Sequence, residues 1–507
     1  MLFWFIGFIG FIGLACAPPD GRDRPLRPVL EEVGPARGLR RLVVETNEPA
    51  RIDVSVDDGL VTWVLPPSAA ATSHEVLVAG LRPDASHTIT VVATFADGAT
   101  RTETYEVETE PLPDDFPPFT VVVADTVNGG LEPGLTLLRI GRYLALVDDR
   151  GEVRWWLAVD HPTHELDVTG HGTLRMVAGK DRILERDVTG AVVAAWSAEP
   201  LGLPALHHDV ADLPGGRLLA LTVERRWVEG YPSSAHDPAA EPEDVWVVGD
   251  VVVEIEPLDR QEARVVRRWP LLDLLDPRRV AYDGVRSGRW GGVFDDPEVR
   301  DWSHANSVWF DAGRGEIVVS LRHQDAVVAI GRDDGALRWL LAPDAHWAEP
   351  WQDRLLRPAE PRELVPYHQH AARITPAGTL LLFDNGNGRA SAFEPRLPDA
   401  RNGSRCVELA LDHHDGTWRR VWDVGSGLDP LVFAGSLGDC DVLPETGHVL
   451  ATFGQITSPA GPGMPGAVVA EVTREDSVEA EILWQLRLPE PLATARAARV
   501  AGWLPGF

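Results

Sequence analysis

The stretches Gly315-Glu-Ile-Val-Val-Ser320 and Gly378-Thr-Leu-Leu-Leu-Phe383 repeat one pattern, a glycine that leads directly into an apolar strand. The same pattern begins at Gly141, Gly172, Gly216 and Gly447. A second series of strands closes on a tryptophan, at Trp155, Trp196, Trp269, Trp339, Trp422 and Trp484. Each series has six members and the two series interleave, which is typical of copies of one strand–turn–strand unit. The chain is therefore predicted to be all-β, with a six-bladed β-propeller over residues 119–507. Its largest insertion, roughly residues 228–301, is a long loop of the kind that often carries function.

Shorter strands precede the propeller, in residues 28–111. In Arg51-Ile-Asp-Val-Ser-Val56 and Thr88-Ile-Thr-Val-Val-Ala93, for example, polar and apolar residues alternate. Such alternation predicts half-buried strands, and several of them within about 85 residues predict a small, fibronectin type III-like β-sandwich. A proline-rich linker at residues 112–118 separates this domain from the propeller.

The composition excludes several classes of function. The 507 residues include 47 Lys and Arg against 77 Asp and Glu, a net charge of −30. This balance argues against nucleic acid or an anionic membrane surface as a partner. The three cysteines form no cluster, which excludes zinc fingers, iron–sulfur sites and disulfide-dense scaffolds.

Residues 1–16 predict a lipoprotein-type signal peptide, followed by a tether over residues 17–27. Residues 2–15 are apolar or small and end at Cys16, a run too short to span a bilayer but suited to a leader. The alternative is a plain signal peptide that contains a chance cysteine. Both interpretations place the protein outside the cytoplasm, in the periplasm or at the cell surface. An acylated Cys16 would then be its only attachment to a membrane.

The two remaining cysteines, Cys406 and Cys440, would then lie in an oxidising compartment, where disulfides persist. We expect one disulfide between them.

Histidines beside the predicted strands carry the most informative chemistry. They lie in His207-His208-Asp209-Val210, Asp301–Ser307, Ser320–Asp325 and Tyr367–His370, and a further polar segment is Phe383–Arg389. Equivalent strands of a propeller face one central channel, so these segments can converge. Because side chains alternate along a strand, His207 and His208 cannot both face the channel, whereas His368 and His370 can.

Two kinds of site fit these residues. His208, His304, His368 and His370 could form a transition-metal site, since imidazole is a common ligand. Arg322 argues against that, because a permanent guanidinium charge is unfavourable beside a cation and favourable beside an oxyanion. We therefore expect an anion pocket with no metal and no cofactor, and we interpret residues 384–388 as a tight turn rather than a calcium loop.

Taken together, these motifs resemble the bacterial arylsulfate sulfotransferases, which do not use the nucleotide donor PAPS. The resemblance lies in Asp301–Ser307, Ser320–Val327, Gln369-His370 and Phe383–Arg389, and later in Ser404–Glu408 and Gly438–Leu443. It covers most of the chain, since the family pairs a small N-terminal β-sandwich with a six-bladed propeller.

The resemblance implies a role for each candidate residue. His370 would be the nucleophile, with His304, Arg322 and His208 binding the sulfate oxygens. His207 is the alternative to His208, and Asn306 is a further candidate for substrate binding. His368 departs from the family pattern and would crowd or tune the site.

The implied reaction moves a sulfuryl group from an aryl sulfate donor to a phenol through a sulfohistidine, with ping-pong kinetics. The sequence leaves a homodimer open. A rival hypothesis is a non-catalytic, surface-anchored propeller that binds a glycan or a protein. It predicts that the cationic residues do not converge. A quinoprotein dehydrogenase is disfavoured, because its usual tryptophan-docking repeats and calcium ligands are not found in the sequence.

Replacing Cys16 tests the leader. If Cys16 is lipidated, Cys16→Ser should lose detergent partitioning and membrane association and should change the size of the mature chain. Unchanged partitioning, association and size would show that the leader is not of the lipoprotein type.

Overall fold

The computed structural model describes residues 24–123, 130–282, 284–285, 288–398, 401–425, 432–458, 465–474, 480–502 and 504. The leader, Cys16 and most of the tether lie outside these residues. Strands dominate the described chain, which confirms the all-β prediction. Its helices are single turns: α1 (Leu271–Leu274), α2 (Gly291–Phe294), η1 (Arg322–Gln324) and η2 (Trp351–Arg354). Among the described residues, no helix has the length and apolar character needed to cross a membrane.

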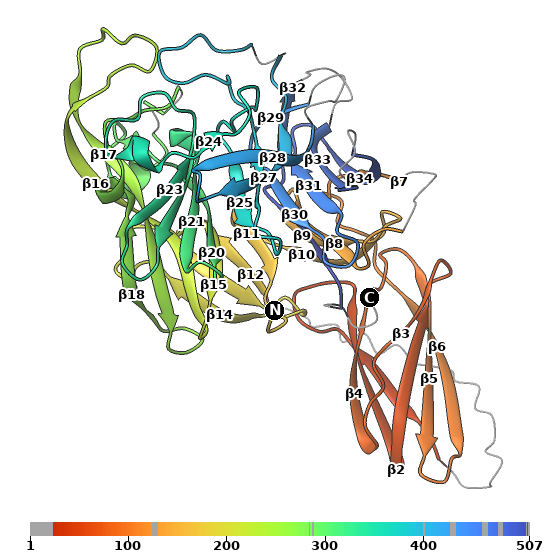
Figure 1. Cartoon of the computed structure of the whole chain (residues 1–507). Coiled ribbons are helices and arrows are strands. Elements are labelled where there is room, and N and C mark those ends of the chain that lie inside the picture. Colours follow the sequence, from red (N-terminus) through yellow and green to blue (C-terminus); the bar gives the residue numbers. More distant parts are fainter. Residues whose placement is uncertain are drawn as a thin grey trace.

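The N-terminal domain is built around one long strand. Its strands are β1 (Arg27–Glu31), β2 (Leu39–Asp57), β3 (Thr62–Val64), β4 (Ala71–Ala79), β5 (Ser86–Phe95) and β6 (Thr100–Glu108). The first half of β2 pairs with β1 and β4, and its second half pairs with β3 and β5. Buried residues alternate along β5, and Trp63 lies in the same core. The domain is all-β, as predicted, and Figure 1 shows it to one side of the larger group of sheets.

The described chain after the linker forms six sheets, each built around four antiparallel strands. The first three contain β8 (Leu135–Ile140), β9 (Tyr143–Val147), β10 (Val153–Ala158) and β35 (Ala497–Val500); β11 (Thr163–Val168), β12 (Leu174–Ala178), β13 (Arg182–Arg186) and β14 (Val192–Ser197); and β15 (His207–Leu213), β16 (Arg217–Tyr231), β17 (Glu243–Pro257) and β18 (Ala263–Pro270), with β19 (Arg300–Asp301) beside β17.

The next three sheets follow in chain order. They contain β20 (Ala305–Asp311), β21 (Glu316–Leu321), β22 (Ala326–Gly331) and β23 (Leu337–Leu341); β25 (His370–Ile374), β26 (Leu380–Asp384), β27 (Arg405–Asp412) and β28 (Thr417–Val424), with β24 (Arg357–Pro358); and β30 (Asp439–Val442), β31 (Val449–Phe453), β33 (Pro465–Val472) and β34 (Ile482–Pro489), with β7 (Thr120–Val123). A separate pair joins β29 (Phe433–Ser436) to β32 (Gln455–Ser458).

The two sequence series fall at repeated places in these sheets. The six tryptophans lie on β10, β14, β18, β23, β28 and β34, the last antiparallel strand of each four-stranded unit. The six glycines precede β9, β12, β16, β21, β26 and β31, and all six have positive φ. Glycine adopts this left-handed backbone without steric cost, which is why it opens each hairpin.

The six sheets pack in a ring. One buried cluster joins the sheets of β17 and β21, another joins those of β22 and β26, and a third joins the last sheet to the first through Leu138 and Trp484. The strands β35, β11, β15, β20, β25 and β30 contact one another in succession, so we call them the inner strands. The C-terminal β35 pairs with β8, and β7 pairs with β34. This closed arrangement of curled sheets is consistent with the predicted propeller (Figure 1).

The predicted disulfide is present. Cys406 on β27 and Cys440 on β30 are bonded, with their Cα atoms 5.9 Å apart. The bond therefore joins two neighbouring sheets of the ring, and both residues are fully buried.

Removing this bond should destabilise the ring. For the Cys406→Ser/Cys440→Ser variant we expect a loss of roughly 3–4 kcal/mol in the free energy of unfolding, because the bond restricts the unfolded chain. Denaturant unfolding of the non-reduced proteins measures this loss. Two alkylatable thiols at these positions in the native protein would contradict the assignment.

Candidate active site

The candidate site lies at the N-terminal ends of three inner strands. His208 is near the start of β15, His304 directly precedes β20, and His370 begins β25. Each of these strands has an irregularity in register within its first residues. The rings of His208 and His304 are 5.2 Å apart between centroids, and the ring of His323 is 4.4 Å from that of His304. The inner strands thus bring together histidines that are far apart in the sequence.

The hydrogen bonds of Asn385 fix the tautomer of His370. The amide nitrogen of Asn385 donates to the carbonyl oxygens of Ala434 and Leu437, both at 2.8 Å. Its side-chain oxygen therefore faces His370 Nδ1, 2.6 Å away, and accepts the proton of that nitrogen. The lone pair of His370 lies on Nε2, the atom suited to nucleophilic attack.

The surroundings of His370 keep its imidazole neutral. Burial lowers the pKa of His370 to about 3, and the positive charge of Arg322 acts in the same direction. Arg322 opens η1, and its Nη2 donates to the carbonyl oxygen of Gly435 at 3.3 Å. The guanidinium charge therefore lies near the proposed nucleophile, as an anion pocket requires.

His304 is oriented by a buried carboxylate. Its Nδ1 lies 2.5 Å from Asp301 Oδ2, while Trp290 Nε1 donates to the other oxygen of Asp301 at 3.0 Å. Burial by itself would raise the pKa of Asp301, but His304 and His323 hold it far below its usual range. Burial lowers the pKa of His304 even though Asp301 opposes this. The pair is therefore a carboxylate and a neutral imidazole that presents Nε2.

Two hydrogen-bonding contacts connect His207 to Arg289 through His208, and Asp250 lies beside His207. His207 Nε2 lies 3.1 Å from Asp250, His207 Nδ1 lies 2.7 Å from His208 Nδ1, and Arg289 Nη2 lies 3.1 Å from His208 Nε2. His208 is thus the member of the pair that contacts His304, whereas His207 is buried against Asp250. Burial and the Arg289 charge lower the pKa of His208 well below its usual value.

Two further candidate residues have contacts that brace the backbone beside His370. Asn306 donates to the carbonyl oxygen of Gln369 at 2.8 Å, and the Nδ1 atom of His368 lies 2.7 Å from Asp325. His368 is fully buried. His208, His304 and His368 have φ angles of 54°, 48° and 53°, a strained backbone for side-chain-bearing residues that concentrates at functional sites.

Arg289, Asn385 and His323 belong to this site, although the sequence analysis assigned them no role. Arg289 comes from the long insertion, and Asn385 comes from the segment that was interpreted as a turn. An Arg-Trp pair within a Gly-rich insertion was the only sequence signal for Arg289.

Asp301, His304 and His323 could also hold a metal ion, because one ligand atom from each lies within 4.8 Å of the others. These atoms are already engaged: His304 Nδ1 is bonded to Asp301, and His323 Nδ1 lies 2.7 Å from the Asp301 carbonyl oxygen. The charges of Arg289 and Arg322 also act on these histidines. The arrangement therefore favours an anion over a cation.

Family comparisons agree with the two-part fold. Residues 120–491 match the family described as Arylsulfotransferase (ASST), and residues 41–110 match the Arylsulfotransferase Ig-like domain. Two curated proteins named "Arylsulfate sulfotransferase AssT" are similar over 353 residues. The one from Escherichia coli O6:H1 (strain CFT073) is 29% identical and the one from Lelliottia amnigena 27%, each covering 60% of this chain and 56% of the relative. The chain thus spans about half the length of these curated relatives.

Solved structures show only distant likeness. A luciferin-regenerating enzyme aligns with a TM-score of 0.33 and 11% identity, covering 74% of this chain and 97% of that one. A putative 6-phosphogluconolactonase from Bacteroides uniformis aligns with a TM-score of 0.30 and 10% identity, covering 90% and 100%. Scores this low support neither a fold nor a function.

The pKa of His370 can be tested directly. As the pH falls through 6.5, the ordinary histidine value, His370 should stay neutral with its proton on Nδ1, because its own pKa is about 3. Arg322→Ala removes one of the causes of the low value and should raise this pKa. Nitrogen-15 NMR of the imidazoles measures both, with His370→Asn to assign the signal. Protonation of both His370 nitrogens near pH 6 in the unsubstituted protein would contradict the assignment.

Proposed function

The chain belongs to the arylsulfotransferase family, and we propose that it transfers a sulfuryl group from an aryl sulfate to a phenol. The observation that carries this proposal is the neutral His370, whose Nδ1 proton is held by Asn385 and whose pKa is lowered by burial and by the charge of Arg322. No metal or nucleotide has a part in the proposed reaction.

In the first step, His370 Nε2 attacks the sulfur of the aryl sulfate. A bond forms between nitrogen and sulfur, the bond between sulfur and the aryl oxygen breaks, and its electron pair leaves with the phenolate. Sulfuryl transfer resembles phosphoryl transfer in its loose transition state, so catalysis depends on positioning and on charge stabilisation. Arg322 supplies a fixed positive charge for the sulfate oxygens, and Arg289 lies beside His208 as a second source.

In the second step, an acceptor phenol attacks the sulfur of the sulfohistidine. The nitrogen–sulfur bond breaks, and its electron pair returns to His370 Nε2. His304 Nε2 takes the phenol proton, and the resulting imidazolium is stabilised by Asp301, 2.5 Å from Nδ1. Because the donor product leaves before the acceptor reacts, the kinetics are ping-pong.

The rival hypothesis, a non-catalytic binding module, predicts cationic residues that do not converge. The contact between the rings of His208 and His304, and the charge of Arg322 acting on His370, weigh against it. We further propose that the protein works outside the cytoplasm, in the periplasm or at the cell surface, anchored through Cys16. The proposed partners are small aryl sulfates and phenols.

Substitutions at His370 and Arg322 test this function. His370→Ala and His370→Asn should abolish transfer from a chromogenic aryl sulfate to a phenol, because each removes the imidazole that carries the sulfuryl moiety. Arg322→Ala should keep the nucleophile but cost about 3 kcal/mol of transition-state stabilisation, or a hundredfold or more in rate. Brief incubation with donor alone should leave an acid-labile sulfate on His370.

Two outcomes would contradict the proposal. Full activity of His370→Ala would exclude His370 as the nucleophile. Loss of activity on treatment of the purified protein with a chelator would point instead to a metal at Asp301, His304 and His323.

A further inference from the structure

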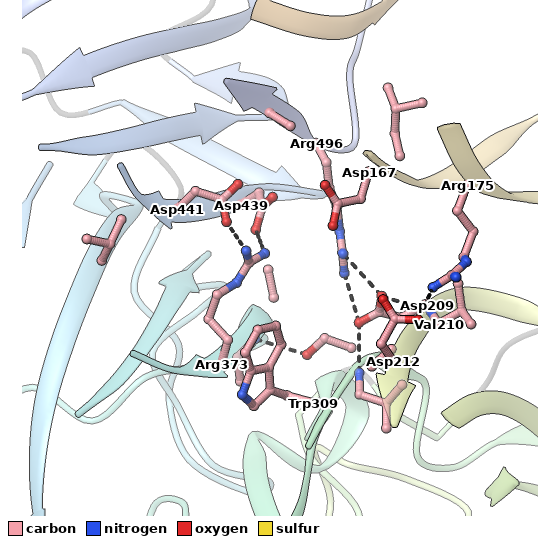
Figure 2. Close-up of a pocket in the computed structure, with 18 of the residues that line it drawn as sticks. Asp167, Arg175, Asp209, Val210, Asp212, Trp309, Arg373, Asp439, Asp441 and Arg496 are labelled. Carbon is pink, nitrogen blue, oxygen red and sulfur yellow. Dashed lines mark hydrogen bonds and ion pairs between the residues drawn. The ribbon is translucent and has the colours of Figure 1, made fainter. Parts of the chain in front are cut away.

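A cavity lies farther along the same inner strands. It has a volume of about 350 Å³ and is lined by residues from all six inner-strand segments. Figure 2 shows charged side chains around this cavity. Among them is Arg373, which forms ion pairs with Asp439 and Asp441. We call it the channel cavity.

On three of the inner strands, β15, β20 and β25, the channel cavity begins one residue after the candidate active site. Asp209, Ser307 and Ala371 line the cavity, and they directly follow His208, Asn306 and His370. The cavity therefore begins one residue beyond the proposed nucleophile.

Arg496 lies at this boundary. Its Nη1 and Nη2 atoms lie 3.1 Å from the two carboxylate oxygens of Asp209, which makes the ion pair bidentate. Asp209 Oδ2 also accepts the backbone N–H of Val308 at 2.8 Å, which ties the pair to β20. Only 12% of the Arg496 side chain is exposed. Figure 2 shows Arg496 reaching down to Asp209.

The charge of Arg496 acts on His370, the proposed nucleophile. Besides burial and Arg322, it contributes to lowering the pKa of His370. The Arg496–Asp209 pair lines the channel cavity directly after His208, and it is held by β15, by β20 and by the segment that leads into the closing strand β35.

We propose that the Arg496–Asp209 pair closes the central channel and keeps water of the channel cavity away from the sulfohistidine, so that a phenol rather than water accepts the sulfuryl group. This inference rests on the proposed function. Without the closure, a water oxygen attacks the sulfur and the nitrogen–sulfur bond breaks. Its electron pair returns to His370 Nε2, the proton of the attacking water passes to solvent in the channel cavity, and sulfate leaves. Arg496 and Asp209 are thus positioning residues that determine the acceptor.

The measurement is the ratio of inorganic sulfate to sulfated phenol, formed from one aryl sulfate donor at a fixed phenol concentration. For Arg496→Ala we expect this ratio to rise about tenfold, because water gains a path to the intermediate. Arg373→Ala is the matched control: it removes an arginine of the same cavity, paired with Asp439 and Asp441, and should leave the ratio unchanged. Equal ratios in the unsubstituted protein and in Arg496→Ala would overturn the inference.

Arg496→Lys separates closure from charge. It keeps the positive charge but cannot make the bidentate contact, so it should also raise the ratio, whereas an effect exerted only through the pKa of His370 would leave the ratio unchanged and would overturn the inference. The pH dependence of donor cleavage in the same variants measures the electrostatic part separately.

Hydrogen exchange provides a readout that does not need activity. The Val308 amide, bonded to Asp209, should exchange faster in Arg496→Ala and in Asp209→Asn than in Arg373→Ala. Unchanged exchange would overturn the closure while leaving the transferase proposal intact. An unsubstituted protein that forms neither product from an aryl sulfate would overturn the proposed function and, with it, the role of the closure.

Discussion

The closing of the ring of sheets is the constraint on which the rest of the structure depends. β35, from the C-terminal end of the chain, pairs with β8, and β7 pairs with β34, so that strands from opposite ends of the chain complete the first and last sheets. Closure leaves only short, protected edges in the described sheets and turns the inner strands toward one axis. The histidines of β15 and of the β20 entry meet because of this geometry. The Cys406–Cys440 disulfide links two neighbouring sheets of the ring.

Within the ring, each histidine is held by a different partner. A carboxylate holds His304, an amide oxygen holds His370, and His207 with Arg289 holds His208. For His304 and His370, these partners fix which nitrogen carries the proton and leave Nε2 available for chemistry. Burial, together with nearby arginines, keeps His208 and His370 neutral. The net charge of −30 therefore says little about the local field, which is set by the few guanidinium groups that the fold turns inward.

The repeat of glycine and tryptophan was sufficient to predict the all-β class, and both series fall at repeated places in the sheets. The pairing of Cys406 with Cys440 was also predictable, since only two cysteines remained after the leader. The separate roles of His207 and His208 were harder to predict. Side-chain alternation excluded that both face the channel, but only the contact of His207 with Asp250 showed which of the two turns away from it. Asn385 was interpreted as a turn residue because local sequence cannot reveal a partner on another strand.

The sequence by itself determined the repeated unit, the order of the motifs and the residue types that the chemistry requires, because these depend on local backbone preference and side-chain chemistry. Only the tertiary structure decided which atoms face one another: Asn385 with His370, Arg289 with His208, and Arg496 with Asp209. These contacts join residues that are 15, 81 and 287 positions apart. Such distances in sequence carry no local signal, and only the closure of the ring makes them short in space.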